Sequence, residues 1–212
     1  FGIKNNIADI KLIDIKSFGK NFKIKIKFMN KIKYFIISND YQNNIYNILS
    51  ALAVISVNLN IFNLNKYIFL NFRIPDGRGD HSIIKINNKK INLIDQSYNS
   101  NPLSLSSAIK NFDKIKSNKS KKYLLLGDML ELGSYSKKLH ESIAPLINQT
   151  KIDKVFVKGK MASLIYKKIS NSKKGKILSN NSQIDDLIRN DIKNNDYLMI
   201  KASLATGFNK IV

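Results

Sequence analysis

The chain has 212 residues, which is enough for one large domain or two small ones with a buried core. It contains no cysteine and only two histidines, so disulfides and thiolate metal sites are excluded and a structural zinc site is not expected. The formal net charge is +21, yet only three of the 36 basic residues are arginine and the lysines are spread along the whole chain. This pattern argues against nucleic acid as the partner, because phosphate and base recognition rely on arginine.

The first part of the chain has the pattern of a small antiparallel sheet followed by a helix. Short apolar runs fill residues 7–37, and within them lysine alternates with apolar residues. This period of two predicts half-buried strands. A helix is expected at about 43–57, and a shorter apolar segment at 61–70. The uncharged stretch 41–65 has a continuous apolar part of only about ten residues, whereas a membrane span needs roughly 20, so we expect a buried helix and no membrane span.

A turn-rich stretch around Pro75 suggests a domain boundary near residue 75. The sequence after it predicts a hairpin that turns at Asn87 and Asn88. Strands and helices then alternate. Helices are expected at about 102–117, 136–149, 160–170 and 182–190, strands at 122–127, 153–159, 176–178 and 196–201, and a last helix from near 205. Repeated strand–helix units with all-apolar strands predict a doubly wound α/β domain around a parallel sheet.

Asp95 stands where an apolar strand ends and a run of amides and serines begins, "DQSYNSNP". Ligands of open parallel sheets bind beyond the carboxyl ends of the strands, and a carboxylate there can accept the hydroxyls of a ribose. Asn101 and Pro102 have a structural explanation as the cap and first residue of the next helix. Asp95, Tyr98 and Asn99 remain as candidates for contact with a ligand, with turn formation as the alternative.

Asp128 repeats this arrangement in "LLLGDMLELG", residues 124–133. It is either a cap for backbone donors in a tight turn or part of a second loop at the same edge. Lys201 ends the last strand, where it would meet an anion near a helix start or be one more surface lysine. His81 and His140 lack metal-ligand spacing and are interpreted as structural or solvent-facing.

Three further residues are candidates for nucleotide contacts. Arg78 is one of the three arginines and lies between Gly77 and Gly79, where the backbone can approach a phosphate closely. Asn44 and Asn47 share one helix face, where they would hold a base or a phosphate or act as ordinary caps. The chain contains no GxxxxGK[ST] phosphate loop, GxSxG or HExxH motif, and therefore no complete catalytic set.

Taken together, these motifs resemble the C-terminal half of a Mur ligase, of the kind whose signatures read D-[DE]-x-Y-N-A-N-P and LGDM-x-ELG. The chain has Asp-Gln-Ser-Tyr-Asn-Ser-Asn-Pro at 95–102 and Leu-Gly-Asp-Met-Leu-Glu-Leu-Gly at 126–133. Asn44-x-x-Asn47, Gly77-Arg78 and Lys201-Ala-Ser203 follow in the family's order. The resemblance covers essentially the whole chain.

The resemblance implies an ATP-dependent ligase of peptidoglycan synthesis that works through an acyl-phosphate and needs Mg²⁺. Its substrates would be ATP, UDP-N-acetylmuramoyl-tripeptide and D-alanyl-D-alanine, and it would be a monomer in the bacterial cytoplasm. Residues 1–75 would be the end of the central ATP-binding domain, and 76–212 would be most of the Rossmann-like C-terminal domain. The phosphate loop, the magnesium ligands and the family's modified lysine would lie upstream of Phe1, so the chain alone is expected to be inactive.

By the same resemblance, the candidate residues fall into two groups. The ATP-binding group is Asn44 and Asn47 at the adenine, Arg78 at the phosphates and Asp95 at the ribose. The group on the dipeptide side is Tyr98, Asn99, Asp128, Lys201 and Ser203.

Among the chain's departures from the family pattern, Gln96 replaces an acidic residue, Asn43 replaces a histidine and Leu204 replaces an arginine. Two other interpretations stay open, a Mur-like scaffold without catalysis and a basic nucleic-acid-binding module.

Overall fold

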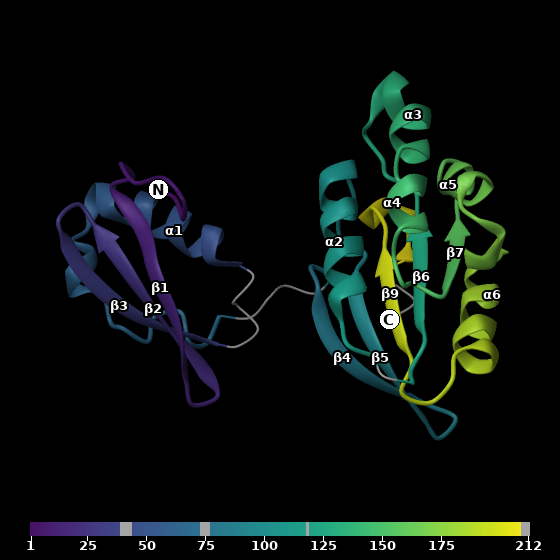
Figure 1. Cartoon of the computed structure of the whole chain (residues 1–212), viewed down its shortest axis with the longest axis horizontal. Coiled ribbons are helices and arrows are strands. Elements are labelled where there is room, and N and C mark those ends of the chain that lie inside the picture. The colour runs from purple at the N-terminus through teal and green to yellow at the C-terminus, as the bar shows by residue number, and fades with distance from the viewer. Residues whose placement is uncertain (39–43, 73–76, 118, 209–212) are drawn as a thin grey trace. The chain divides into compact units, whose positions relative to one another are not determined.

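Residues 1–38, 44–72, 77–117 and 119–208 are described by the structure, which is a computed structural model. The chain divides into two units, Phe1–Ile74 and Pro75–Val212, and each is described by itself. Figure 1 shows a small sheet with a helix in the first unit and a larger sheet flanked by helices in the second. The predicted boundary at residue 75 lies outside the described residues.

The sheet of the first unit is an antiparallel meander of β1 (Ile10–Phe18), β2 (Asn21–Phe28) and β3 (Lys31–Ser38). Ile24 and Ile26 of β2 are fully buried, because the alternation directs them toward the core formed with α1 (Ile45–Asn58). The predicted strands and helix are therefore present. The expected segment at 61–70 begins with a short 3-10 turn at Ile61–Asn63.

The sheet of the second unit has six strands in the order β4-β5-β9-β6-β7-β8. β4 pairs antiparallel with β5, and the turn between them is made by Asn87 and Asn88 at positive φ, as predicted. The other strands pair parallel, and β9, β6 and β7 point the same way in Figure 1. Their bounds are Asp80–Ile86 (β4), Lys89–Gln96 (β5), Lys122–Gly127 (β6), Lys154–Lys158 (β7), Lys174–Ile177 (β8) and Tyr197–Lys201 (β9).

Helices cover both faces of this sheet, which confirms the predicted doubly wound α/β fold. α2 (Pro102–Lys114), α4 (Ala144–Asn148) and α5 (Ala162–Lys168) pack on the face that includes Leu124 and Leu126 of β6. α6 (Asn181–Asp186) packs on the opposite face with Leu125. Every residue of β6 is buried, as expected for a strand covered on both sides.

Three predicted helices differ in the structure. The helix expected at 136–149 is split into α3 (Ser136–Glu141) and α4, since Pro145 cannot donate a hydrogen bond to the preceding turn. The helix expected at 182–190 is α6, which continues into a π-helical turn at Leu187–Asp191. In place of the last helix, a 3-10 turn at Leu204–Thr206 stops at Gly207 with a φ of 76°, and residues 209–212 lie outside the described residues.

No helix among the described residues has the length and apolar composition that crossing a membrane requires.

Candidate functional site

The candidate residues of the second unit gather at the carboxyl ends of three neighbouring strands. β9 lies between β5 and β6, and Lys201 at its end is in register with Gln96 on one side and Leu126 on the other. Asp95 is therefore one residue before the end of β5, and Asp128 follows directly after β6. This is the edge at which open α/β sheets bind ligands.

Asp95 is almost completely buried, with 6% of its surface exposed. Its Oδ1 accepts a hydrogen bond from the backbone N–H of Ser97 at 2.9 Å, which turns the chain away from the strand. This contact explains why a buried strand ends on a carboxylate followed by amides and serines. The structural and functional interpretations of Asp95 are compatible, because a carboxylate has a second oxygen with which to accept.

Lys201 is also buried, with 4% of its surface exposed. Its Nζ donates to the backbone oxygen of Asn99 and lies 3.5 Å from that of Gln96, so the ammonium lies under the loop after β5. Burial lowers the pKa of Lys201 from 10.5 to about 8, and the nearby Asp95 carboxylate acts in the opposite direction. Lys201 is therefore not one more surface lysine.

Ser203 and Leu204 connect the loops that follow β5 and β6. The Oγ of Ser203 accepts from the backbone N–H of Leu130 at 3.0 Å, and its own N–H donates to the oxygen of Asp128 at 3.2 Å. The N–H of Leu204 donates to the oxygen of Tyr98 at 3.1 Å. The segment after β9 thus holds both loops in place through hydrogen bonds to their backbones.

Asp128 caps a helix in this structure. Its Oδ1 accepts from the N–H of Ala162, the first residue of α5, at 2.7 Å. Gly159 makes this approach possible, because a Cβ at that position would lie 2.3 Å from the same oxygen. Met129, the next residue of the loop, donates its N–H to Nε2 of His140 at 2.9 Å.

His140 and Gly159 support this loop, and the sequence analysis did not assign either of them to the site. His140 is fully buried, and its Nδ1 lies 2.7 Å from the oxygen of Ser136, so it links α3 to the loop as a neutral ring with the proton on Nδ1. It is structural, whereas His81 is exposed. A glycine that follows a strand is the signal that could have indicated a close approach of the backbone at Gly159.

The exposed candidate residues of the second unit are Arg78, Tyr98 and Asn99. The guanidinium carbon of Arg78 lies 4.1 Å from the centre of the Tyr98 ring, whose residue is 41% exposed. Beneath them, the hydroxyls of Ser97 and Ser100 are buried and have no hydrogen-bond partner among the described residues. The site therefore combines exposed groups, which are an aromatic ring, an amide and a guanidinium, with buried polar groups.

Asn44 and Asn47 lie in the first unit, at the start of α1. The side-chain N–H of Asn47 donates to Oδ1 of Asn44 at 3.2 Å, so these two amides bond to each other. Asn44 precedes the helix without capping it through its side chain, which removes the ordinary-cap interpretation for that residue. Asn43, where the family has histidine, lies outside the described residues.

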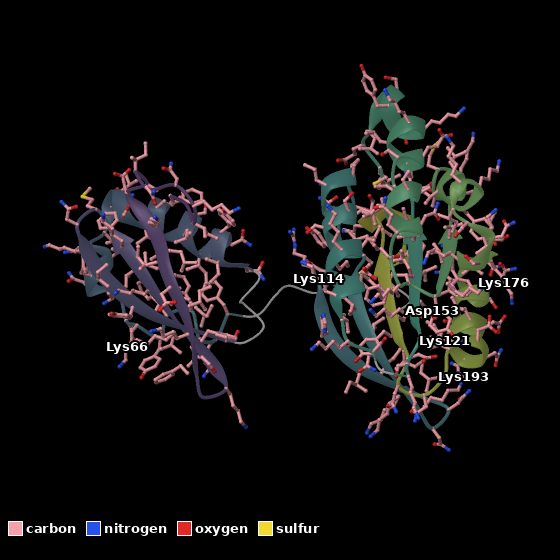
Figure 2. The ribbon with its side chains drawn as sticks, viewed as in Figure 1. Lys66, Lys114, Lys121, Asp153, Lys176 and Lys193 are labelled. Carbon is pink, nitrogen blue, oxygen red and sulfur yellow. The ribbon has the colours of Figure 1, made fainter. Side chains whose placement is uncertain are left out.

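At the amino ends of the parallel strands, two carboxylates accept hydrogen bonds from the backbone. Asp196 accepts from the N–H groups of Lys121 and Lys193, and Asp153 accepts from the N–H of Lys122. Figure 2 labels Lys121, Asp153 and Lys193 at these strand ends. These acids are used in backbone hydrogen bonds, as loop-closing residues are.

The lysines that Figure 2 labels come from different elements of both units, among them Lys66, Lys114 at the end of α2 and Lys176 of β8.

The chemistry available at the strand ends is binding. The site offers the exposed Arg78 guanidinium, exposed amide groups and the buried Asp95 carboxylate, which suit an anion and a hydroxyl-bearing ligand. Among the described residues, no three His, Asp or Glu side chains group as metal ligands. These residues do not fit a magnesium site, and we assign no step to a metal here.

The fold and the strand-end site define a Rossmann-like domain in the second unit, and the comparisons with known proteins identify the family. A family profile described as "Mur ligase, glutamate ligase domain" matches residues 82–204. The chain belongs to the Mur ligase family.

Within that family, the curated relatives are UDP-N-acetylmuramoyl-tripeptide–D-alanyl-D-alanine ligases, which confirms the resemblance predicted from the motifs. The Rickettsia prowazekii relative is 27% identical over 208 residues, which are 97% of this chain and 44% of that protein. A relative from Buchnera aphidicola subsp. Baizongia pistaciae is 31% identical over 215 residues, covering 100% of this chain and 44% of that protein. The chain thus spans less than half the length of these relatives.

Solved structures agree on the fold. MurF ligase from Thermotoga maritima in complex with ADP matches with a TM-score of 0.68 at 21% identity, over 96% of this chain and 45% of that one. MurF from Acinetobacter baumannii matches with a TM-score of 0.74 at 17% identity, over 98% and 45%.

Proposed function

We propose that this chain is the C-terminal part of an ATP-dependent ligase that joins D-alanyl-D-alanine to UDP-N-acetylmuramoyl-tripeptide. The observation that supports this most directly is the pair of strand-end loops, 95–102 and 126–133, which carry the signatures of that ligase inside the region matched by the family profile. The relatives that align along nearly all of the chain bear that name.

The proposed reaction has two steps. The terminal carboxylate of the tripeptide attacks the γ-phosphate of ATP, forming an acyl-phosphate and ADP. The amine of D-alanyl-D-alanine then attacks the acyl carbon, the C–O bond to phosphate breaks, and an amide, inorganic phosphate and a proton result. Bringing the amine to the activated carbon is the contribution expected of a C-terminal domain, because orientation alone lowers such a barrier substantially.

In this proposal, residues 1–75 belong to the ATP-binding domain and residues 76–212 form the C-terminal domain. Asn44 and Asn47 would contact the adenine, Arg78 the phosphates and Asp95 the ribose. Magnesium, which shields phosphate charge in such reactions, would be held by residues outside this chain.

On the dipeptide side, the geometry divides the candidates by exposure. Tyr98 and Asn99 are exposed and can reach a ligand. Lys201 and Ser203 are buried and bonded to loop backbones, and Asp128 is bonded to α5. These three would act by holding the loops that present the dipeptide site.

A chimaera tests the proposed function. The aligned 208-residue segment of the Rickettsia prowazekii relative is replaced by this chain. We expect phosphate release that requires ATP, the UDP-linked tripeptide and D-alanyl-D-alanine together. Arg78→Ala should lower kcat/KM by about tenfold or more, since a charge-assisted phosphate contact is lost.

Arg189→Ala is the matched control, because Arg189 is exposed on the π-helical turn, far along the chain from the strand-end loops. The chain by itself should form no product, since it carries no phosphate-loop motif. A folded chimaera that binds ATP and the UDP-linked tripeptide but releases no phosphate would favour the non-catalytic scaffold instead.

A further inference from the structure

Residues 77–79 are attached to the loop that follows β5. The N–H of Tyr98 donates to the oxygen of Gly77 at 3.1 Å, and the N–H of Gly79 donates to the oxygen of Asp95 at 2.7 Å. Gly77 has a φ of 71°, and a Cβ there would lie 3.1 Å from Cβ and N of Tyr98. The backbone on both sides of Arg78 therefore follows the strand-end loop closely, and Arg78 belongs structurally to the second unit.

The side chain of Arg78 lies over the Tyr98 ring, with 4.1 Å between the guanidinium carbon and the ring centre. A guanidinium is planar and its N–H donors lie in that plane, so the Arg78 group above the ring can still direct donors at an oxyanion. The N–H of Leu204 also donates a hydrogen bond to the backbone oxygen of Tyr98. The backbone of Tyr98, from which the ring projects, is therefore held by two separate segments.

We propose that Tyr98 is a positioning residue, whose ring holds the Arg78 guanidinium at the strand-end edge so that its in-plane N–H groups face a polyphosphate. This inference rests on the proposed function only for the identity of the anion as ATP. It moves Tyr98 from the dipeptide side of the site to the phosphate side.

The first test is direct, because the chain has only three arginines and hence three Nε–H signals. In the NMR spectrum of the 212-residue chain, the Arg78 side-chain protons should be shifted upfield by the Tyr98 ring. Tyr98→Phe should keep this shift, since the ring and not the hydroxyl provides the platform. Tyr98→Leu should abolish it, while the β-sheet amides of the variant show that the fold persists.

The second test measures anion binding at the same signal, with inorganic tripolyphosphate and with ATP as probes. We expect both to shift the Arg78 Nε–H. The apparent affinity should be about threefold weaker in Tyr98→Leu, the size of effect of an exposed cation–π contact, and unchanged in Tyr98→Phe. Tyr135→Leu is the control, because Tyr135 is 69% exposed on another loop, and the Arg189 signal reports non-specific binding.

The outcomes separate the two proposals. If tripolyphosphate binding depends on the ring but ATP binds no better than tripolyphosphate, the positioning role stands and the nucleotide assignment fails. If the ring shift is absent, if neither anion moves the Arg78 signal, or if Tyr98→Leu binds tripolyphosphate as tightly as the wild type, the positioning role is wrong.

Discussion

At the scale of single residues, Lys201 is the most unusual group at the strand ends. Its ammonium is buried beneath the loop after β5, and its hydrogen bonds go to backbone oxygens. A buried amine is costly to protonate, which is why its pKa falls to about 8. Between about pH 8 and 10.5 the unfolded chain binds a proton at this lysine that the folded chain has lost, so stability contributed by Lys201 rises with pH across that window.

The prediction is measured as a difference, because other lysines and tyrosines titrate in the same range. The free energy of unfolding of the wild type minus that of Lys201→Met should increase from pH 8 to pH 10.5, by about 3 kcal/mol at most. Urea unfolding at several pH values measures it. A difference that stays flat, or that falls as the pH rises, would show that the Lys201 ammonium is not desolvated in the folded protein.

How well the sequence predicts single residues depends on whether local pattern determines their environment. The position of Asp95 at a strand end follows from an apolar run that stops at a carboxylate. The burial of Lys201 does not follow, because a lysine that ends a strand has the same pattern whether or not a loop folds over it. The hydrogen bond between Asn44 and Asn47 could be predicted from helix spacing, because the two residues lie about one turn apart.

At the scale of elements, the loop after β6 is held in place by hydrogen bonds to three different segments. Asp128 bonds to α5, Met129 to His140 of α3, and Leu130 to Ser203 after β9. Two of these contacts reach residues 34 and 73 positions away, whereas His140 lies 11 positions away in the next α-helix. Periodicity predicts the elements, but it does not predict such hydrogen bonds, since these depend on which elements become neighbours in the fold.

Gly159 allows one of these hydrogen bonds to be tested. Gly159→Ala would place a Cβ 2.3 Å from Oδ1 of Asp128, in a backbone with a φ of 130°. We expect a loss of about 2 to 4 kcal/mol in the free energy of unfolding, because both the steric and the backbone terms are unfavourable. Gly133→Ala is the matched control: its φ is 54° and a Cβ there meets no atom within 4 Å, so it should cost only about 1 to 2 kcal/mol.

Urea unfolding measures both variants. In an Asp128→Ala background the steric part of the Gly159→Ala penalty should disappear, which leaves the backbone part. Equal losses for the two glycine variants would mean that the close approach of Asp128 does not constrain residue 159.

At the scale of the whole molecule, the strand order is the feature that the sequence did not predict. Alternating strands and helices predicted the parallel sheet and its covered faces. They did not predict that β9 lies between β5 and β6, because all these strands carry apolar runs that suit any central position. Yet this insertion places Lys201 and Ser203 between the two motif loops. The loops carry the family signatures, and the last strand brings the groups that hold them.

The described residues form three hydrophobic cores, which lead to the last prediction. One lies wholly within the first unit, and the two others lie on the two faces of the large sheet in the second. Because the described residues of each unit build cores of their own, we expect each unit to unfold as its own cooperative transition. Residues 77–212 expressed alone should reproduce, within about 0.5 kcal/mol, the free energy of unfolding that amides of the second unit report in the whole chain. NMR spectra recorded along a urea series would measure it, and the amides of residues 97–100 would show whether the loop after β5 keeps its native chemical shifts. A fragment that is unfolded in buffer, or a single shared transition in the whole chain, would mean that the first unit contributes to the stability of the second.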